Sequence, residues 1–405
     1  MKIEKRTQME WLFLSYFIVV LAHSAIPYLK FILWLSIILM TVVMMVRNGI
    51  SRIQGKNILM VTLSYGLFLM WVYMSKNWAY VQRPNAGIIE TMIRILPVLI
   101  ALAYYINSQE RIYKILDIFI VAAAYFAIVY IITSPISTYG TTAMRGITEQ
   151  HRNFSAYLSA INIIFSYYMF DLTKKRKYLV CVICSLALVV IAGSRGAIFS
   201  LAVMIVLYLL FQPSLNKRMR NFLVALVIVL IGSYILFTND YLYQIYGKRI
   251  FEMFSNKDSS AEDRSYYIEL AFQMFWQRPI LGWGMDNFAY YLNVFGHYGR
   301  EVYSHCNYAE ILSCYGIVGF VFYYWPYFVT IQKQWSARYS NKLSKVLLII
   351  MIRFFIFEYS TISFEHIIYM SVLTLLFCGS NVLNYERNIQ DEKNNLLSEK
   401  SISDI

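Results

Sequence analysis

Apolar segments long enough to cross a lipid bilayer recur along almost the whole chain. A spanning helix needs about 20 mainly apolar residues, because its backbone polar groups must be satisfied within the segment where water is absent. We predict about twelve spans, at residues 11–29, 31–46, 58–75, 88–106, 115–134, 154–171, 178–193, 196–211, 222–238, 311–330, 346–362 and 367–383. Only 15% of the residues are charged, against roughly 25% in soluble domains. The sequence therefore predicts an all-α polytopic membrane protein.

Lysine and arginine gather in alternate loops between these segments. The basic loops lie near residues 47–56, 111–114, 174–177, 217–220 and 333–345. Because short basic loops remain in the cytoplasm, we predict that both termini are cytoplasmic and that the long loop faces outward. Much of the formal net charge of +13 is then a topology signal with some contact to anionic membrane lipid, and it needs no nucleic-acid partner.

This topology divides the chain into four parts. They are residues 1–238 with transmembrane helices 1 to 9, the helical extracytoplasmic loop 239–310, residues 311–383 with transmembrane helices 10 to 12, and the cytoplasmic tail 384–405. The tail is polar, so we expect it to be disordered. The five cysteines show no spacing typical of a disulfide framework.

The stretch Ser194-Arg195-Gly196-Ala197 places an arginine where one apolar segment ends and the next begins. An ionisable side chain at the edge of the hydrocarbon layer is costly and indicates a functional site. A snorkelling arginine that marks a membrane boundary is the alternative.

The loop at residues 239–310 is far longer than an ordinary connection. Within it, apolar residues at 267, 268, 271, 274 and 275 follow one face of a predicted helix at 262–277, which we expect to lie on the membrane surface. Arg278-Pro279 ends this helix. Arg264 falls in its predicted first turn, where the helix dipole disfavours a cation. This position indicates an anionic partner, with a salt bridge to a neighbouring carboxylate as the alternative.

Three motifs resemble the O-antigen ligase and polymerase superfamily. They are S-R-G-A at 194–197, D-R at 263–264 leading a helix that ends in R-P-I-L-G-W-G-M-D-N-F at 278–288, and His305 with Asn307, Glu310 and Y-G-I-V-G at 315–319. The motifs cover about residues 140–325. The family often has His-Asn together, whereas Cys306 intervenes here and weakens any direct role for Asn307. The resemblance implies a bacterial cytoplasmic (inner) membrane enzyme of GT-C-like architecture. It would act on the outer face and transfer glycan from an undecaprenyl-pyrophosphate carrier.

The residue chemistry agrees with such a reaction. The leaving group would be a pyrophosphate, and fixed arginines bind phosphate oxygens bidentately in a dry site. We therefore expect Arg195 and Arg264 to clamp the donor. His305 is the candidate catalytic base for the acceptor hydroxyl, with a structural histidine as the alternative. Glu310 would orient that ring or bind sugar, or would only cap the following helix.

Other charged residues carry weaker expectations. Arg145 and Arg152, with His151 between them in sequence, lie in the outer loop before residue 154 and are further candidates for substrate binding. The alternative is that these side chains only lie at the membrane surface. The same two interpretations apply to Glu90 and Arg94, at the start of the fourth predicted span. Arg353 and Glu358 fall within the predicted eleventh span, where intramembrane charges usually find partners or line a cavity, so they are candidates for a buried pair.

Three functions remain open from the sequence. The preferred one is a polymerase that joins lipid-linked repeat units for O-antigen, capsule or exopolysaccharide. The second is a ligase that transfers finished glycan to a lipid A core acceptor. The third is a flippase, although the inverted repeats of transporters are not visible. No cluster of carboxylates with metal-ligand spacing occurs on the outer face, so no cofactor and a metal-independent reaction are predicted. A chain-length regulator is a candidate partner.

Overall fold

The computed structural model describes residues 6–23, 26–82, 87–141, 143–148, 150–212, 214–240, 259–296 and 302–403, with the single residues 243, 247 and 299. Helices dominate these ranges, and no strand occurs within them. The long helices are α1 (Gln8–Ala22), α2 (Pro27–Asn48), α3 (Arg52–Val61), α4 (Leu67–Met74), α5 (Ile88–Tyr105), α6 (Gln109–Thr133), α7 (Arg152–Thr173), α8 (Arg176–Ala192), α9 (Arg195–Leu210), α10 (Leu215–Thr238), α13 (Ser259–Gln277), α14 (Asn287–Val294), α15 (Asn307–Ala337), α16 (Lys342–Phe357) and α17 (Ile367–Ser403). The short helices are η1 (Thr62–Gly66), η2 (Ser75–Trp78), η3 (Ile136–Thr138) and η4 (Gly146–Thr148).

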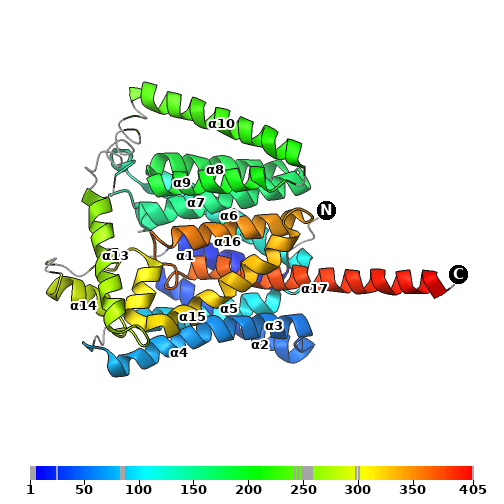
Figure 1. Cartoon of the computed structure of the whole chain (residues 1–405), viewed down its shortest axis with the longest axis horizontal. Helices are drawn as coiled ribbons and strands as arrows, with labels where there is room; N and C mark the ends of the chain where they lie inside the picture. Colours follow the sequence, from blue (N-terminus) through cyan, green and yellow to red (C-terminus); the bar gives the residue numbers. More distant parts are fainter. Residues whose placement is uncertain are drawn as a thin grey trace.

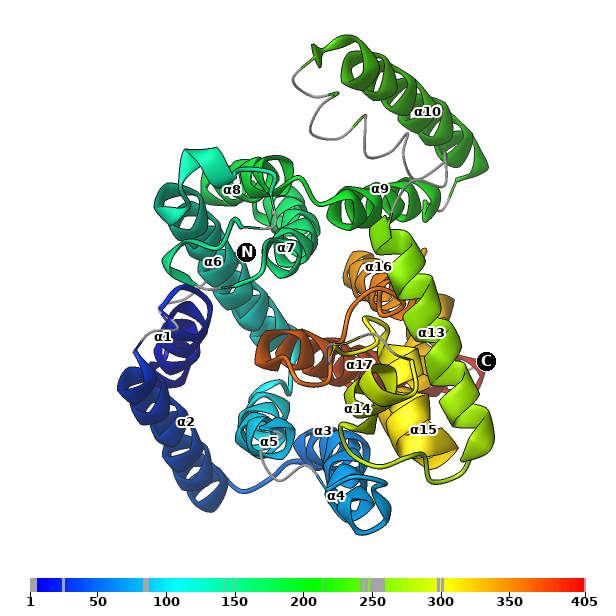
Figure 2. The same ribbon diagram turned by 90° about the vertical axis from the view of Figure 1, so that its left-hand side faces the viewer.

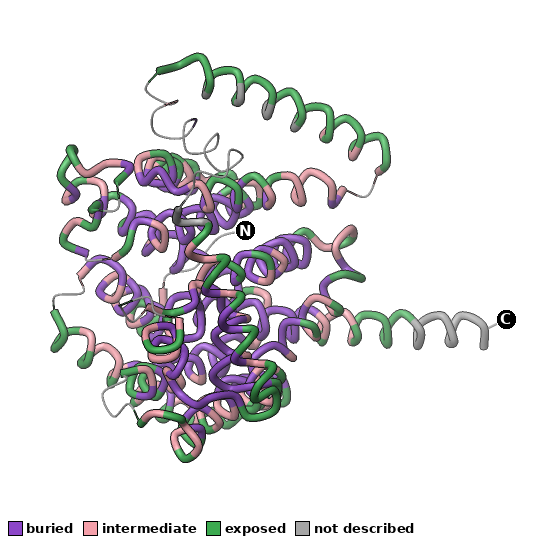
Figure 3. The backbone as a smooth tube through the Cα atoms, turned by 60° about the vertical axis from the view of Figure 1, so that its left-hand side comes forward, coloured by how far each residue is buried: buried purple, intermediate pink, exposed green. Residues whose placement is uncertain are grey.

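Most of these helices run side by side in one bundle (Figure 1). Helix α13 lies across one end of the bundle and packs on α15, and α17 projects from the other end (Figure 1). Figure 2 shows the end that α13 crosses. Buried residues concentrate in the middle of the bundle, and α10, which packs mainly against α9, is exposed along its length (Figure 3). The end crossed by α13 carries the site described below.

Every predicted span overlaps a helix of the structure, with α3, η1 and α4 forming one continuous segment. Six helical segments in the described ranges are long and apolar enough to cross a membrane: Pro27–Asn48, Arg52–Trp78, Ile88–Tyr105, Gln109–Thr133, Asn307–Ala337 and Ile367–Asn394. The apolar helices α1 and α9 are shorter. The chain thus has the character of a multi-pass membrane protein. The number of twelve spans, the GT-C-like arrangement and the orientation stay predictions.

Local sequence signals explain several helix ends. Thr7 and Glu10 form a capping box that begins α1, and the Asn341 side chain caps α16. At the end of the bundle away from α13, buried Asp117 of α6 accepts hydrogen bonds from Arg6 at 2.7 Å and Tyr178 at 2.7 Å. These bonds tie the start of α1, α6 and α8 together, and they give a buried carboxylate the partners that it requires.

Two expectations about helix ends are wrong. The tail is not disordered through residue 403, because α17 continues as one helix to Ser403. Residues 384–403 contain no glycine or proline, and Arg387 and Asp391 have the i,i+4 spacing that supports a helix. The eleventh span also ends earlier than predicted. Helix α16 stops at Phe357, and residues 358–366 form a loop beside the site.

Candidate active site

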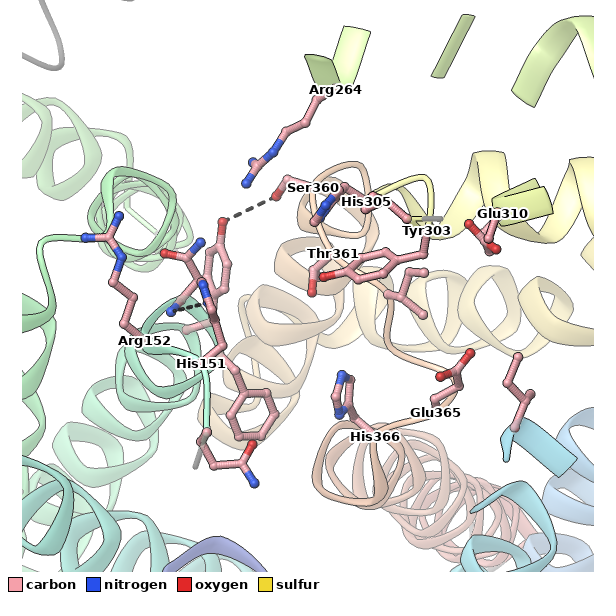
Figure 4. A pocket seen from close by; sticks show the side chains of 18 of the residues that line it. His151, Arg152, Arg264, Tyr303, His305, Glu310, Ser360, Thr361, Glu365 and His366 are labelled. Carbon is pink, nitrogen blue, oxygen red and sulfur yellow. Dashed lines mark hydrogen bonds between the residues drawn. The ribbon is translucent and has the colours of Figure 1, made fainter. Parts of the chain in front are cut away.

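A cavity of about 890 Å³ opens at the end of the bundle crossed by α13 (Figure 4). Its walls come from the start of α7, from α13 and α14, from the turn before α15, and from the loop between α16 and α17. Its polar lining residues are Gln150, His151, Arg152, Asn153, Tyr157, Arg264, Asp286, Tyr303, His305, Glu310, Ser360, Thr361, Glu365 and His366. Segments far apart in the sequence therefore meet around one space.

A turn after α13 fixes this helix against α15. The backbone N–H of Trp283 donates to Ser313 at 2.9 Å, and that of Ile317 donates to Pro279 at 2.8 Å. Helix α15 is interrupted at Gly316, with φ 65° and ψ −169°, a conformation that essentially only glycine adopts. A Cβ at Gly316 would overlap the Ile280 carbonyl. The predicted stop after α13 is confirmed, and it positions α13 over the cavity.

Arg264 reaches the cavity from α13, whose apolar face is buried as predicted. The helix begins at Ser259, so Arg264 lies in its second turn. The prediction that Arg264 occupies the unfavourable first turn is therefore wrong. The dipole argument for an anionic partner is therefore lost. The evidence for its role is now its place in the cavity wall, three residues before Tyr267 and on the same face of the helix.

His305 lies in the turn between the cavity and α15. Its φ of 58° is positive, which is uncommon for a residue other than glycine, and such outliers gather at functional sites. Its ring stacks on Tyr267 of α13, with centroids 6.0 Å apart, and contacts Tyr303 at 4.1 Å. These rings hold the imidazole beneath Arg264 at the cavity edge (Figure 4).

Glu310 lines the cavity but is buried, at 6% exposure. Its carboxylate accepts a hydrogen bond from the backbone N–H of Ser304 at 2.8 Å, next to His305. This bond ties Glu310 to the turn before α15, and the predicted roles of Glu310 towards the ring, a sugar or the helix start stay predictions. The carboxylate stabilises the turn that presents the histidine, because a buried N–H at a helix start needs such a partner.

Asn307 anchors the loop that follows α16. It is fully buried, its side-chain oxygen accepts from the Ser363 N–H at 3.0 Å, and its side-chain nitrogen donates to Glu358 at 3.3 Å. Glu358 also accepts from Tyr324 at 2.7 Å and Tyr327 at 2.6 Å. Asn307 thus holds the cavity wall from behind, despite the intervening cysteine.

The expected Arg353–Glu358 pair is wrong. No ion pair joins these two buried residues, both of which lie in the described part of the chain. Arg353 instead donates to Ser200 at 3.2 Å and faces the Tyr157 ring at 5.2 Å. Tyrosine hydroxyls bind the Glu358 carboxylate. Arg353 has Ser200 and an aromatic face beside it, and its buried Nη2 has no hydrogen-bond partner in the described part of the chain.

Arg195 begins α9 but is not one of the residues that line the cavity. Its neighbour Gly196 touches the wall, since a Cβ there would overlap the Tyr157 hydroxyl. Tyr157 lines the cavity and lies 3.3 Å from Ser360 through its hydroxyl oxygen. The S-R-G-A motif therefore lies directly behind the wall, with half-buried Arg195 beside it.

Arg152 lines the cavity and is 8% exposed. One of its guanidinium nitrogens donates to the Gly140 carbonyl and to the Ala192 carbonyl, the latter at 3.2 Å. These hydrogen bonds connect the loop before α7 to the end of α8. Arg145 is exposed and does not line the cavity. Desolvation, followed by the charges of Arg152, Arg145 and Arg264, lowers the pKa of His151. All three arginines therefore lie close enough to disfavour a positive charge on His151.

Glu365 and His366 line the opposite wall and were not predicted as site residues (Figure 4). Desolvation, with smaller effects from Glu310 and Asp286, raises the pKa of Glu365 to about 7. His366 is exposed to the cavity, and its ring contacts Phe154 at 5.3 Å. The adjacent Glu-His pair between two apolar runs was the available sequence signal, and it was hidden by the overlong eleventh span.

Residues 180–324 match the family described as O-antigen ligase. This part of the chain is similar to the members of that family. The match confirms the resemblance to the O-antigen polymerase and ligase superfamily, and it supports a glycosyltransferase-type enzyme acting in O-antigen or polysaccharide biosynthesis. The chain matches none of the curated proteins.

The O-antigen ligase segment includes four of the predicted site residues: Arg195, Arg264, His305 and Glu310. Arg145 and Arg152 precede it, and the loop with Glu365 follows it. The structure gathers Arg152, Arg264, His305 and Glu310 at the cavity and leaves Arg145 and Arg195 out of its lining.

The remaining candidates lie away from this space. Glu90 and Arg94 form an exposed i,i+4 ion pair at 3.4 Å and do not line the cavity. All five cysteines are free, as expected. In the ranges that the structure describes, no group of three or more His, Cys, Asp or Glu side chains could hold a metal ion. Metal independence stays a prediction.

Proposed function

We propose that the protein polymerises oligosaccharide repeat units carried on undecaprenyl pyrophosphate. The growing glycan would leave its lipid pyrophosphate and join the non-reducing-end sugar of a second lipid-linked unit. The observation that carries this proposal is the cavity in which Arg264, Arg152 and His305 meet, within and beside an O-antigen ligase segment. The active site would face outward from the cytoplasmic membrane, where glycan carried on lipid is available.

The arginine side of the cavity suits the donor. As the bond between the anomeric carbon and the pyrophosphate oxygen breaks, the electron pair and negative charge go to the leaving group. Arg264 and Arg152 would stabilise that charge in a site shielded from bulk water. Arg195, behind the Tyr157 wall, would add to the same positive field.

His305 suits the acceptor. A neutral imidazole takes the proton of the attacking hydroxyl while the new bond to the anomeric carbon forms, and such general base catalysis typically contributes about 10²–10⁴-fold. Glu310, through Ser304, and Tyr267, through ring stacking, would hold the imidazole in place. The products are the elongated glycan and a free lipid pyrophosphate, with one proton released from the histidine.

A ligase that transfers glycan to a lipid A core is the second candidate, favoured by the description of the matching family. The two reactions share the donor chemistry and differ in the acceptor. Purified protein in proteoliposomes separates them. With a lipid-linked repeat unit as the only substrate, a polymerase makes a ladder of products. A ligase makes product only after lipid A core is added, and that result would replace the polymerase proposal.

A further inference from the structure

We propose that Glu365 makes the acceptor side of the cavity selective for an uncharged sugar and against an anionic one. This inference rests on the proposed glycosyl transfer and adds the class of acceptor. It assigns a specificity role to a residue outside the O-antigen ligase segment.

Charge is divided within the cavity. Arg152, His151 and Arg264 lie on one side, whereas Glu310 and Glu365 lie on the other (Figure 4). The pKa of His151 is lowered by desolvation and by neighbouring arginines. The pKa of Glu365 is raised by desolvation and by neighbouring carboxylates. Burial is the largest cause of both shifts, and like-charged neighbours add to each of them. Together with the placement of these residues, this gives the cavity a positive side and a negative side.

Tyr303 lies between the positive side and the negative side of the cavity (Figure 4). Burial raises the pKa of Tyr303, Arg264 lowers it, and Glu310 and Glu365 raise it. Its ring contacts His305. The proposed base is thus at the boundary between a positive side suited to pyrophosphate and a negative side left for the acceptor.

Glu365 is the carboxylate with capacity for a ligand. The Glu310 carboxylate is buried and accepts a hydrogen bond from the Ser304 N–H, so it stabilises the turn before α15. Within the described part of the chain, no hydrogen bond or ion pair is formed by the half-buried Glu365 side chain. A carboxylate accepts two hydrogen bonds at once, a geometry that suits neighbouring sugar hydroxyls.

The same wall disfavours an anionic acceptor. A uronic acid or a phosphorylated sugar would bring negative charge towards Glu365, Glu310 and Asp286 in a partly dry space. Like charges that are close together in such a space repel each other, and juxtaposed like charges exclude wrong partners. A hexose meets no such repulsion and supplies the hydroxyl donors.

The test uses the full-length protein in proteoliposomes and two acceptors that differ only in the terminal sugar, a hexose or the corresponding hexuronic acid. The donor is a lipid-linked repeat unit blocked at its non-reducing end. At pH 8, above the raised pKa of Glu365, we expect wild type to prefer the hexose in kcat/KM. Glu365→Gln should reduce that preference at least about tenfold and raise KM for the hexose acceptor, with donor KM unchanged. Glu365→Asp keeps the charge, so it should keep the preference while weakening hexose binding.

Glu269→Gln is the matched control, because Glu269 is exposed on α13 and does not line the cavity. If Glu365→Gln keeps the full preference, or changes donor KM instead, the inference is wrong. If Glu365→Gln fails to assemble, loss of the preference in Glu365→Asp overturns it equally. Failure of the proposed function is distinguishable, since wild type would then transfer no glycan to either acceptor.

Discussion

Gly316→Ala should uncouple the turn after α13 from α15, and Gly49→Ala provides a control with the same backbone conformation. Gly316 has φ 65° and ψ −169°, and Gly49, after α2, has φ 71° and ψ −169°. Alanine at either position costs roughly 1–3 kcal/mol of backbone strain. The two sites therefore differ mainly in the space around the added methyl group.

That space separates the expected losses. Nothing lies within 4 Å of a Cβ at Gly49, whereas a Cβ at Gly316 overlaps the Ile280 carbonyl and lies 2.8 Å from the Gly282 nitrogen. Overpacking costs about 1–3 kcal/mol, and weakening the Ile317–Pro279 hydrogen bond adds about 1 kcal/mol. Gly316→Ala should therefore lower the free energy of unfolding by about 2–4 kcal/mol more than Gly49→Ala does.

Reversible unfolding in mixed detergent micelles measures this difference, and glycan transfer by the same preparations measures its functional effect. Because the turn positions Arg264 over His305, a displacement of about 1 Å could cost roughly 10²-fold in rate. Gly49→Ala, far from the cavity, should retain its rate. Equal losses of stability in the two variants would refute the steric reasoning, and a normal rate in Gly316→Ala would refute the positioning role of the turn.

Three further predictions follow from the site. Arg264→Lys should lose most glycan transfer while inserting normally, since a bidentate phosphate contact is lost with the charge retained; wild-type amounts of polymer on a gel would contradict the donor role. The preference against an anionic acceptor should weaken as the pH falls through about 7, because Glu365, which faces Glu310, Asp286, Tyr303 and His366, becomes protonated below its raised pKa. The preference of Glu365→Gln should vary less between pH 6 and 8 than that of wild type, and a flat wild-type profile would exclude Glu365 as the titrating group. For topology, a cysteine at exposed Trp276 should react with an impermeant label in intact cells, and a cysteine at Lys175 only after permeabilisation; the reverse pattern would overturn the orientation.

Local signals in the sequence predicted the elements better than the contacts between them. The 3.6-residue period and Arg278-Pro279 predicted the buried face and the end of α13. The predicted start was late, because Ser259 and Ser260 precede the apolar pattern. Arg264 and His305 were predicted to act together, and they lie at one cavity.

Non-local contacts explain what was missed. The interruption of α15 at Gly316 depends on the Ile280 carbonyl from a different segment, so an apolar run alone predicted a continuous span. The apolar run before residue 362 likewise concealed the end of α16. Helix α16 ends where Asn307, Tyr324 and Tyr327 bind Glu358, and this break brings Glu365 to the cavity. Such partners cannot be identified from one sequence without the fold.

We propose that the protein transfers glycan in this cavity with His305 as the base. The most direct test of this proposal is single-turnover transfer by purified wild type and His305→Ala in proteoliposomes that contain a lipid-linked repeat unit, with donor binding measured on the same samples. We expect one round of glycan transfer by wild type and no detectable transfer by His305→Ala, with donor binding retained because the arginines hold the pyrophosphate. Turnover near the wild-type rate in His305→Ala would contradict the proposal.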